Sequence, residues 1–221
     1  MKRKRLIVAA GLLTAIIYVI GIITGFYMQK AMESQTKSTL AAMQNDLAKM
    51  RQSLENIQME QLYLSSNEGP LGCQFLRSDI TKIQDDLGFF LERLPRKLEV
   101  YVNETTLDQQ YEQVKKDYML ISLRVWLLSK ITKEKCGSET VPVIFFYSRQ
   151  CPDCIRQGEE LDLARGNVAN LAIFTIDAGL DEPVVKAVKE TYNITATPSL
   201  VAGNATFNRL VSAAELQELL R

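Results

Sequence analysis

The chain has 221 residues, of which 47% are hydrophobic, and its 26 basic and 26 acidic residues give no formal net charge. This balance excludes the excess of positive charge that is typical of nucleic-acid-binding proteins, so we expect no nucleic-acid partner. The sequence contains four cysteines and no histidine.

An uncharged segment, residues 6–28, follows four basic residues at positions 2–5. At about 1.5 Å per residue, a helix of this length crosses the roughly 30 Å hydrocarbon core of a lipid bilayer. The basic cluster predicts that residues 1–5 are cytoplasmic and that everything after residue 28 is extracytoplasmic. A cleaved signal peptide is the alternative, but its apolar core usually has about 7 to 15 residues, and no clear cleavage site follows here. We therefore expect an uncleaved, single-pass anchor in the cell membrane.

A coiled-coil stalk is predicted for residues 33–64. Its core positions recur at alternating steps of four and three residues, which is the heptad period. One solution is a parallel homodimer, to which the GxxxG pair of Gly21 and Gly25 in the anchor would contribute. The other solution is packing against the chain's own later helices. The core positions are Thr36, Leu40, Met43, Leu47, Met50, Leu54 and Ile57.

Residues 70–135 form a predicted helical hairpin domain. A turn-rich stretch at 65–70 separates it from the stalk. Two segments with one apolar face each predict its helices. Residues 103–105 are the predicted turn between them, and residues 98–102 could be helical or extended. The apolar positions are Leu76, Ile80, Ile83, Leu87, Phe90 and Leu94 in the first helix, and Leu107, Tyr111, Val114, Tyr118, Ile121, Val125 and Leu128 in the second.

Cys73 and Cys136 lie at equal distances from the predicted turn, so an antiparallel hairpin brings them together at its base. We interpret them as a structural disulfide, and closing a loop of about 60 residues stabilises a fold by roughly 4 kcal/mol in the chain-entropy model. Two alternatives stay open: the pair could exchange electrons with Cys151 and Cys154, or all four sulfurs could bind zinc. Zinc is disfavoured because Cys73 and Cys136 lack the close cysteine spacing of four-thiolate sites.

The motif Cys151-Pro152-Asp153-Cys154 follows an apolar run at 141–147 and precedes a helical segment. A cysteine reacts as the thiolate, and the unpaired N–H groups and positive dipole end of a helix N-terminus lower the pKa of a cysteine placed there. Cys151 is therefore the predicted attacking sulfur. Cys154, one turn later on the same helix, can resolve the mixed disulfide that the attack creates.

The remaining C-terminal segments predict a strand at 171–176, a helix at 181–192, a hairpin of strands at 199–202 and 206–210, and a final helix at 213–220. With the strand at 141–147 and the helix after Cys151, the order is β-α-β-α-β-β-α. This order, the CPDC motif after a buried strand, and Thr197-Pro198 before another strand resemble the thioredoxin superfamily. The resemblance covers residues 138–221 and implies an α/β, thioredoxin-like C-terminal domain.

In that superfamily the proline is cis and lies beside the two cysteines, and the backbone of the preceding residue pairs with the substrate. The resemblance therefore implies that Thr197 and Pro198 bind the substrate, together with Pro152 and Asp153. Phe145 stands where thioredoxins proper have a buried acid, and the Cys-Pro-x-Cys form is more similar to glutaredoxins and periplasmic oxidases. Asp153 replaces the histidine of strong oxidases, and its carboxylate should oppose thiolate formation, so we expect a less oxidising pair.

We expect a membrane-anchored thiol-disulfide oxidoreductase that acts on protein thiols or disulfides outside the cytoplasm, with no cofactor and no metal ion. Cys151 and Cys154 would be its catalytic residues, and a redox partner would reset them. Oxidase, isomerase and reductase activities use the same residues and differ in the reduction potential and in that partner. The alternative is a non-catalytic scaffold, tethered to the membrane, whose thioredoxin-like head only binds partners.

Overall fold

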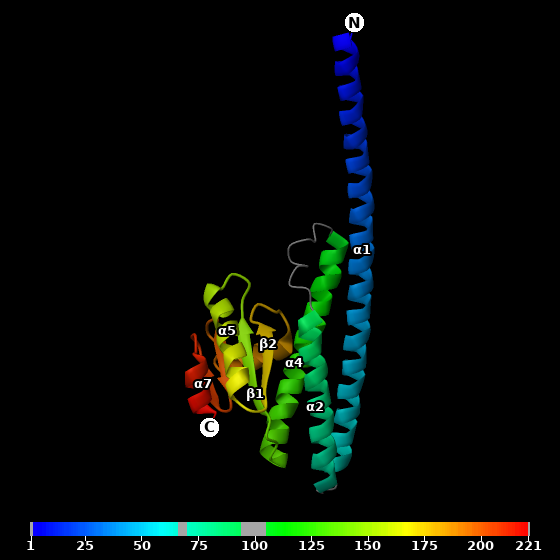
Figure 1. Ribbon diagram of the computed structural model, residues 1–221. Coiled ribbons are helices and arrows are strands. Elements are labelled where there is room, and N and C mark those ends of the chain that lie inside the picture. Colours follow the sequence, from blue (N-terminus) through cyan, green and yellow to red (C-terminus); the bar gives the residue numbers. More distant parts are fainter. Residues whose placement is uncertain (1, 66–69, 94–104, 221) are drawn as a thin grey trace. The chain divides into compact units, whose positions relative to one another are not determined.

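The computed structural model describes residues 2–65, 70–93 and 105–220, and the chain divides into two units, Met1–Gln44 and Asn45–Arg221. The turns predicted at 65–70 and 103–105 and the segment 98–102 fall mainly outside the described residues. The described residues of the first part of the chain form three helices, and a small mixed sheet with further helices follows, coloured yellow-green to red in Figure 1. The three helices are α1 (Lys2–Ser65), α2 (Pro70–Arg93) and α4 (Thr105–Cys136).

The first unit consists of the N-terminal part of α1, which includes the predicted anchor. This helix is long and apolar enough to cross a membrane, and its described apolar side chains up to Met28 are exposed. The hydroxyls of Thr14 and Thr24 donate to the carbonyls of Gly11, at 2.9 Å, and Ile20, at 2.8 Å. Such internal hydrogen bonds satisfy polar groups without water, as the core of a bilayer requires. The N-terminal helix is thus consistent with single-pass anchoring in a membrane.

The last part of α1, residues 45–65, belongs to the second unit. Four predicted heptad positions in this stretch are buried, and Arg51 beside them forms an ion pair with Asp117 of α4 at 3.3 Å. Packing against the chain's own later helices therefore accounts for this part of the heptad pattern. A homodimer through the anchor stays a prediction. The four buried positions are Leu47, Met50, Leu54 and Ile57.

Helices α2 and α4 run antiparallel. A disulfide joins Cys73, near the start of α2, to Cys136 at the end of α4, and further along α2 the amide of Gln84 donates to the hydroxyl of Ser129 at 2.7 Å. The contact on α4 therefore moves back toward its start as the contact on α2 moves forward, as in a helical hairpin. The predicted apolar positions whose side chains are described are all buried, namely Leu76, Ile80, Ile83, Leu87, Tyr111, Val114, Tyr118, Ile121, Val125 and Leu128.

The elements after α4 follow the predicted order of strands and helices. They are β1 (Val141–Tyr147), α5 (Pro152–Asn167), β2 (Leu171–Asp177), α6 (Pro183–Thr191), β3 (Ser199–Ala202), β4 (Ala205–Phe207) and α7 (Ala213–Leu219). The strands form one sheet in the order β2-β1-β3-β4. β1 pairs in parallel with β2 and antiparallel with β3, and β4 pairs antiparallel with β3. The sheet is therefore mixed, with β1 as an inner strand.

Both faces of β1 are buried because helices cover both sides of the sheet. Side chains alternate along a strand, and Val143 and Phe145 belong to a core that also contains residues of α5 and α7. Ile144 and Phe146 alternate with them and are fully buried on the opposite face. Helix α4 packs against β1 and β2, and Figure 1 shows the sheet between α4 and the pair formed by α5 and α7.

The last strand, β4, is shorter than the predicted strand at 206–210. Asn208 follows its last residue, and the Asn208 side chain bonds to Ser199 at the start of β3 and to the segment before it. Its carboxamide oxygen accepts from the N–H of Thr195 at 3.1 Å, and its amide group donates to the carbonyl of Asn193 at 3.0 Å. These bonds tie the end of the hairpin to the segment that leads into Thr197.

Candidate redox site at Cys151 and Cys154

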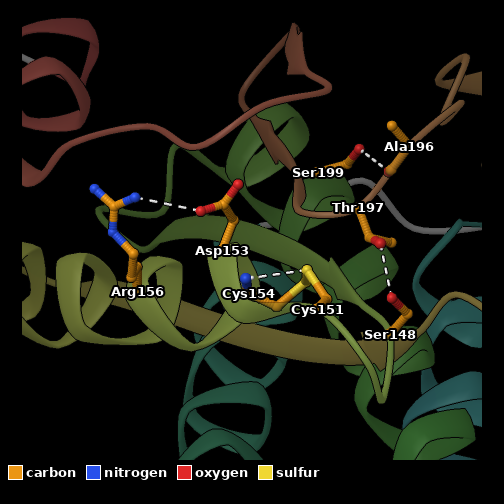
Figure 2. The surroundings of a disulfide bond; sticks show 8 residues. All are labelled: Ser148, Cys151, Asp153, Cys154, Arg156, Ala196, Thr197 and Ser199. Atoms are coloured by element: carbon orange, nitrogen blue, oxygen red, sulfur yellow. Dashed lines mark hydrogen bonds and ion pairs between the residues drawn. A yellow bond between two sulfur atoms is a disulfide. The ribbon is translucent and has the colours of Figure 1, made fainter.

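The two cysteines of the CPDC motif form a disulfide at the N-terminus of α5, with their Cα atoms 5.2 Å apart. Cys151 is the N-cap residue and has an extended backbone, and Pro152 occupies the start of the helix, where no N–H partner is needed. The N–H of Cys154 donates to the Sγ of Cys151 at 3.0 Å (Figure 2). The sulfur of Cys151 therefore lies at the N–H end of the first helical turn, where it shares the N–H of Cys154 with the carbonyl of Cys151.

The two sulfurs of this disulfide differ in access to solvent. Cys154 is 7% exposed and belongs to the core between the sheet, α5 and α7, whereas Cys151 is partly exposed at the edge of that core. Pro152 and Asp153, between them, are exposed. An external thiolate can therefore approach Cys151 more readily than Cys154, and the roles expected for the two sulfurs stay predictions.

The carboxylate of Asp153 has a cationic partner that the sequence analysis did not consider. Arg156 lies one turn further along α5, and its Nη1 is 3.3 Å from Oδ1 of Asp153 (Figure 2). Both side chains are largely exposed, so water screens the pair strongly. The guanidinium nevertheless offsets part of the negative charge that Asp153 brings to the cysteines.

Thr197 and Pro198 directly precede β3, which is paired with β1, and they lie beside the C-terminal end of β1. The β1–β3 register places Phe146 opposite Ser199, so Ser148, two residues after Phe146, comes opposite Thr197. The hydroxyls of Ser148 and Thr197 are 2.8 Å apart and hydrogen-bonded (Figure 2). The Thr197-Pro198 peptide bond is cis, as the resemblance implies. Thr197 is partly exposed, whereas Pro198 is buried.

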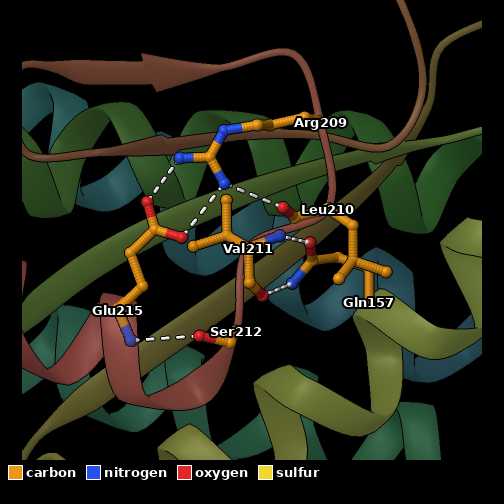
Figure 3. A network of polar contacts seen from close by, with 6 residues as sticks. All are labelled: Gln157, Arg209, Leu210, Val211, Ser212 and Glu215. Carbon is orange, nitrogen blue, oxygen red and sulfur yellow. Dashed lines mark hydrogen bonds and ion pairs between the residues drawn. The ribbon is translucent and has the colours of Figure 1, made fainter.

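Gln157 holds α5 in place through a buried pair of hydrogen bonds, which Figure 3 shows. Its amide donates to the carbonyl of Val211 at 3.0 Å, and its carbonyl oxygen accepts from the N–H of Val211 at 2.7 Å. Gln157 and Val211 are each 1% exposed. The sequence motifs do not include Gln157, and its signal in the sequence is a glutamine on the same helical face as Cys154 and Leu161.

The segment on both sides of Val211, residues 209–215, is fixed by an ion pair and by a helix cap (Figure 3). Arg209 binds the carboxylate of Glu215 with both of its terminal nitrogens, and Ser212 caps α7 by accepting from the N–H of Glu215 at 3.2 Å. The hydrogen bonds from Arg209 hold the pKa of Glu215 below its usual value, and the carboxylate raises the pKa of Arg209 in turn.

Helix α4 forms several ion pairs with the loops at the C-terminal ends of β1 and β2. Lys115, which is 9% exposed, lies 3.8 Å from Asp177 at the end of β2 and 5.7 Å from the ring centre of Tyr147 at the end of β1. Glu112 pairs with Arg149, two residues before Cys151, and Lys116 pairs with Glu182. The hydrogen bond with Glu182 raises the pKa of Lys116.

The second disulfide, Cys73–Cys136, lies at the other end of β1. The Nζ of Lys133, in the last turn of α4, is 3.2 Å from the carbonyl of Thr140, directly before β1 begins. The seven residues of β1 span about 20 Å at roughly 3.3 Å per residue, and Cys151 follows the far end of that strand. Thiol-disulfide exchange needs contact between sulfurs, so this distance disfavours a direct relay between the two pairs within one chain.

Comparisons with known proteins give little context for this site. No family model matches the chain, and no curated protein matches it. A solved structure described as "Structure of a malarial protein" matches at 18% sequence identity and covers 37% of this chain and 94% of that chain. Its TM-score is 0.33, which is too low to support an argument about this protein.

Proposed function

We propose that this chain is a membrane-anchored thiol-disulfide oxidoreductase with a thioredoxin-like C-terminal domain, acting on protein substrates outside the cytoplasm. The observation that carries the proposal is the Cys151–Cys154 disulfide at the start of α5, with one partly exposed and one buried sulfur. The mixed sheet, the order of its elements and the position of Thr197 opposite Ser148 support the thioredoxin-like assignment.

The proposed reaction is an exchange of two electrons between the cysteine pair and a protein client. In the oxidising direction, a client thiolate attacks the sulfur of Cys151, forms a mixed disulfide and releases Cys154 as a thiolate that takes up a proton. A second client thiolate then attacks the client sulfur of the mixed disulfide and releases Cys151. The client gains a disulfide, and Cys151 and Cys154 become a dithiol. The reverse sequence reduces a client disulfide, with Cys151 attacking and Cys154 resolving.

The proposed location follows from the N-terminus of the chain. Basic residues 2–5 precede the apolar part of α1, and the positive-inside rule puts them in the cytoplasm. The cysteine pairs then lie in a compartment where disulfides persist. The cysteine pair needs a redox partner that resets it after each turnover. The apolar part of α1 needs a lipid bilayer around it.

The first experiment uses the full chain in detergent micelles and measures reduction of insulin disulfides by dithiothreitol. We expect the wild type to accelerate this reaction and Cys151→Ser to abolish the acceleration. A double variant, Cys73→Ser with Cys136→Ser, is the control and should retain it, since that pair lies far from Cys151. Equal rates for the wild type and Cys151→Ser would refute the enzymatic proposal.

The second experiment separates the enzyme from the non-catalytic scaffold and sets the direction of electron flow. A Cys154→Ala variant cannot resolve mixed disulfides, so clients should remain attached to Cys151 and be visible on non-reducing gels. The absence of such adducts would favour the scaffold. Equilibration of the wild type with glutathione gives the reduction potential, where a value near −270 mV indicates a reductant and one near −120 mV an oxidant; both are approximate reference values.

A further inference from the structure

Thr197 presents an unpaired stretch of backbone beside the disulfide. It lies two residues before β3, and the β1–β3 register ends at Phe146 and Ser199. Within the described part of the chain, neither the N–H nor the carbonyl of Thr197 forms a hydrogen bond with another backbone group. Unpaired backbone groups at the end of a strand can pair with an extended polypeptide, which gains main-chain hydrogen bonds there.

One side-chain hydrogen bond connects this backbone stretch to the segment that carries Cys151. The hydroxyl of Ser148, directly after β1, meets the hydroxyl of Thr197 at 2.8 Å. Ser148 precedes Cys151 by three residues, and Figure 2 shows the bonded pair near the Cys151 side of the disulfide. Both side chains are partly buried, so water competes less with this bond than it would on an open surface.

Apart from this bond, the Ser148 loop and the Thr197 segment are held by different contacts. On the Ser148 side, the loop is fixed by the end of β1 and by the ion pair between Arg149 and Glu112 of α4. On the Thr197 side, the carbonyl of Ala196 accepts from the hydroxyl of Ser199, and Thr195 and Ser199 both bind Asn208, so these bonds stay on the β3 side. The Ser148 hydroxyl is therefore the described contact that ties Thr197 directly to the segment carrying the redox pair.

We propose that Ser148 is a positioning residue for client binding: its hydroxyl holds Thr197 so that the free backbone groups of Thr197 pair with an extended client segment beside Cys151. The inference rests on the proposed oxidoreductase function and adds a residue to it. Ser148 transfers no electrons and does not contact the reacting sulfurs. Its loss should therefore weaken reactions with polypeptides and leave the thiol chemistry itself largely intact.

The test compares a polypeptide substrate with a substrate that has no peptide backbone. Full-length protein in detergent is reduced either by a synthetic peptide with two cysteines in an extended sequence or by dithiothreitol, with oxidised glutathione present to regenerate the Cys151–Cys154 disulfide. Both turnover rates are followed after subtraction of the rate without protein. For Ser148→Ala we expect kcat/KM for the peptide to fall about three- to tenfold, mainly through KM, as the loss of one hydrogen bond implies. The dithiothreitol rate should change by less than about twofold.

Three further variants separate positioning from a general structural effect. Ser148→Thr keeps a hydroxyl and should restore the peptide KM to within about twofold of the wild type. Thr197→Val removes the same bond from the other side, and it tests the proposal independently if Ser148→Ala does not fold. Both substitutions delete the same hydrogen bond. The double variant Ser148→Ala with Thr197→Val should therefore have a peptide KM no higher than that of the more impaired single variant.

Each result decides for or against the positioning role. An unchanged peptide KM, additive losses in the double variant, or an equal loss with dithiothreitol would overturn it while leaving the oxidoreductase proposal intact. A wild-type protein that exchanges with neither substrate would overturn the oxidoreductase proposal, and the positioning role with it. A selective loss with the peptide, rescued by Ser148→Thr, would support the role.

Discussion

The substitution Gln157→Met tests how α5, which carries Cys154 and is capped by Cys151, is held in place. Methionine has nearly the length and volume of glutamine, so the change removes two hydrogen bonds without opening a cavity. The N–H and the carbonyl of Val211 then lose their partners in surroundings where Val211 is only 1% exposed. Each unsatisfied buried polar group costs about 1 to 3 kcal/mol.

Two such groups would cost about 2 to 6 kcal/mol, and burying a thioether is easier than burying an amide, which offsets part of this. We therefore expect the free energy of unfolding of the second unit to fall by about 3 kcal/mol. For a unit of this size, that loss lowers the midpoint temperature by roughly 6 to 12 °C. It is a large fraction of the about 5 to 15 kcal/mol by which domains are usually stable.

The assay is urea unfolding of full-length protein in detergent, followed by tryptophan fluorescence. Trp126 is the single tryptophan of the chain and is 1% exposed on α4, so its emission reports on the second unit. Glu159→Met, at an exposed position two residues further along α5, is the matched control and should shift the midpoint little. Equal midpoints for Gln157→Met and Glu159→Met would refute the reasoning.

Three more predictions concern stability and the reduction potential. Replacing Cys73 and Cys136 by serine should lower the stability of the oxidised protein by roughly 4 kcal/mol, and a reductant should abolish the difference from the wild type. Burial raises the pKa of Tyr118 to about 12, whereas an unfolded tyrosine ionises near about 10. The contribution of neutral Tyr118 to stability is therefore complete below about pH 10 and is lost as the pH rises to about 12, which lowers the free energy of unfolding by about 2 to 3 kcal/mol. Tyr118→Phe should remove this dependence of the urea midpoint on pH. Asp153→Asn should make the redox pair more oxidising and Arg156→Gln less oxidising, each by on the order of 10 mV against glutathione, and shifts of the opposite sign would contradict the charge argument.

The sequence predicted the buried strands and helix faces well, because apolar residues in a regular pattern are buried in the core. The apolar run at 141–147 and the run at 199–202 coincide with β1 and β3, because a continuous apolar stretch can only be buried on both faces. The heptad and helical periods located the buried positions of α1, α2 and α4 in the same way. Periodicity reports which face is buried, and this suffices for the core.

Periodicity does not report which element covers that face. The period of Leu47, Met50, Leu54 and Ile57 fits a homodimer seam and an intramolecular contact equally well, and the structure buries these residues within the chain. The contacts of Gln157, Lys115 and Ser148 were not predictable for a related reason. Each joins residues about 50 or more positions apart, and no local pattern encodes such a pairing.

Helix α4 connects the two disulfides of the second unit. Its last residue carries the Cys73–Cys136 bond, and its earlier residues Glu112 and Lys115 pair with the loops at the redox end of the sheet. The same helix packs on β1 and β2, on the face where Ile144 and Phe146 are fully buried. Residues 138–221 alone would therefore expose an apolar face of the sheet. The sheet and its C-terminal helices therefore depend on α4 to cover that face, and the hairpin that includes α4 contributes directly to the surroundings of Cys151 and Cys154.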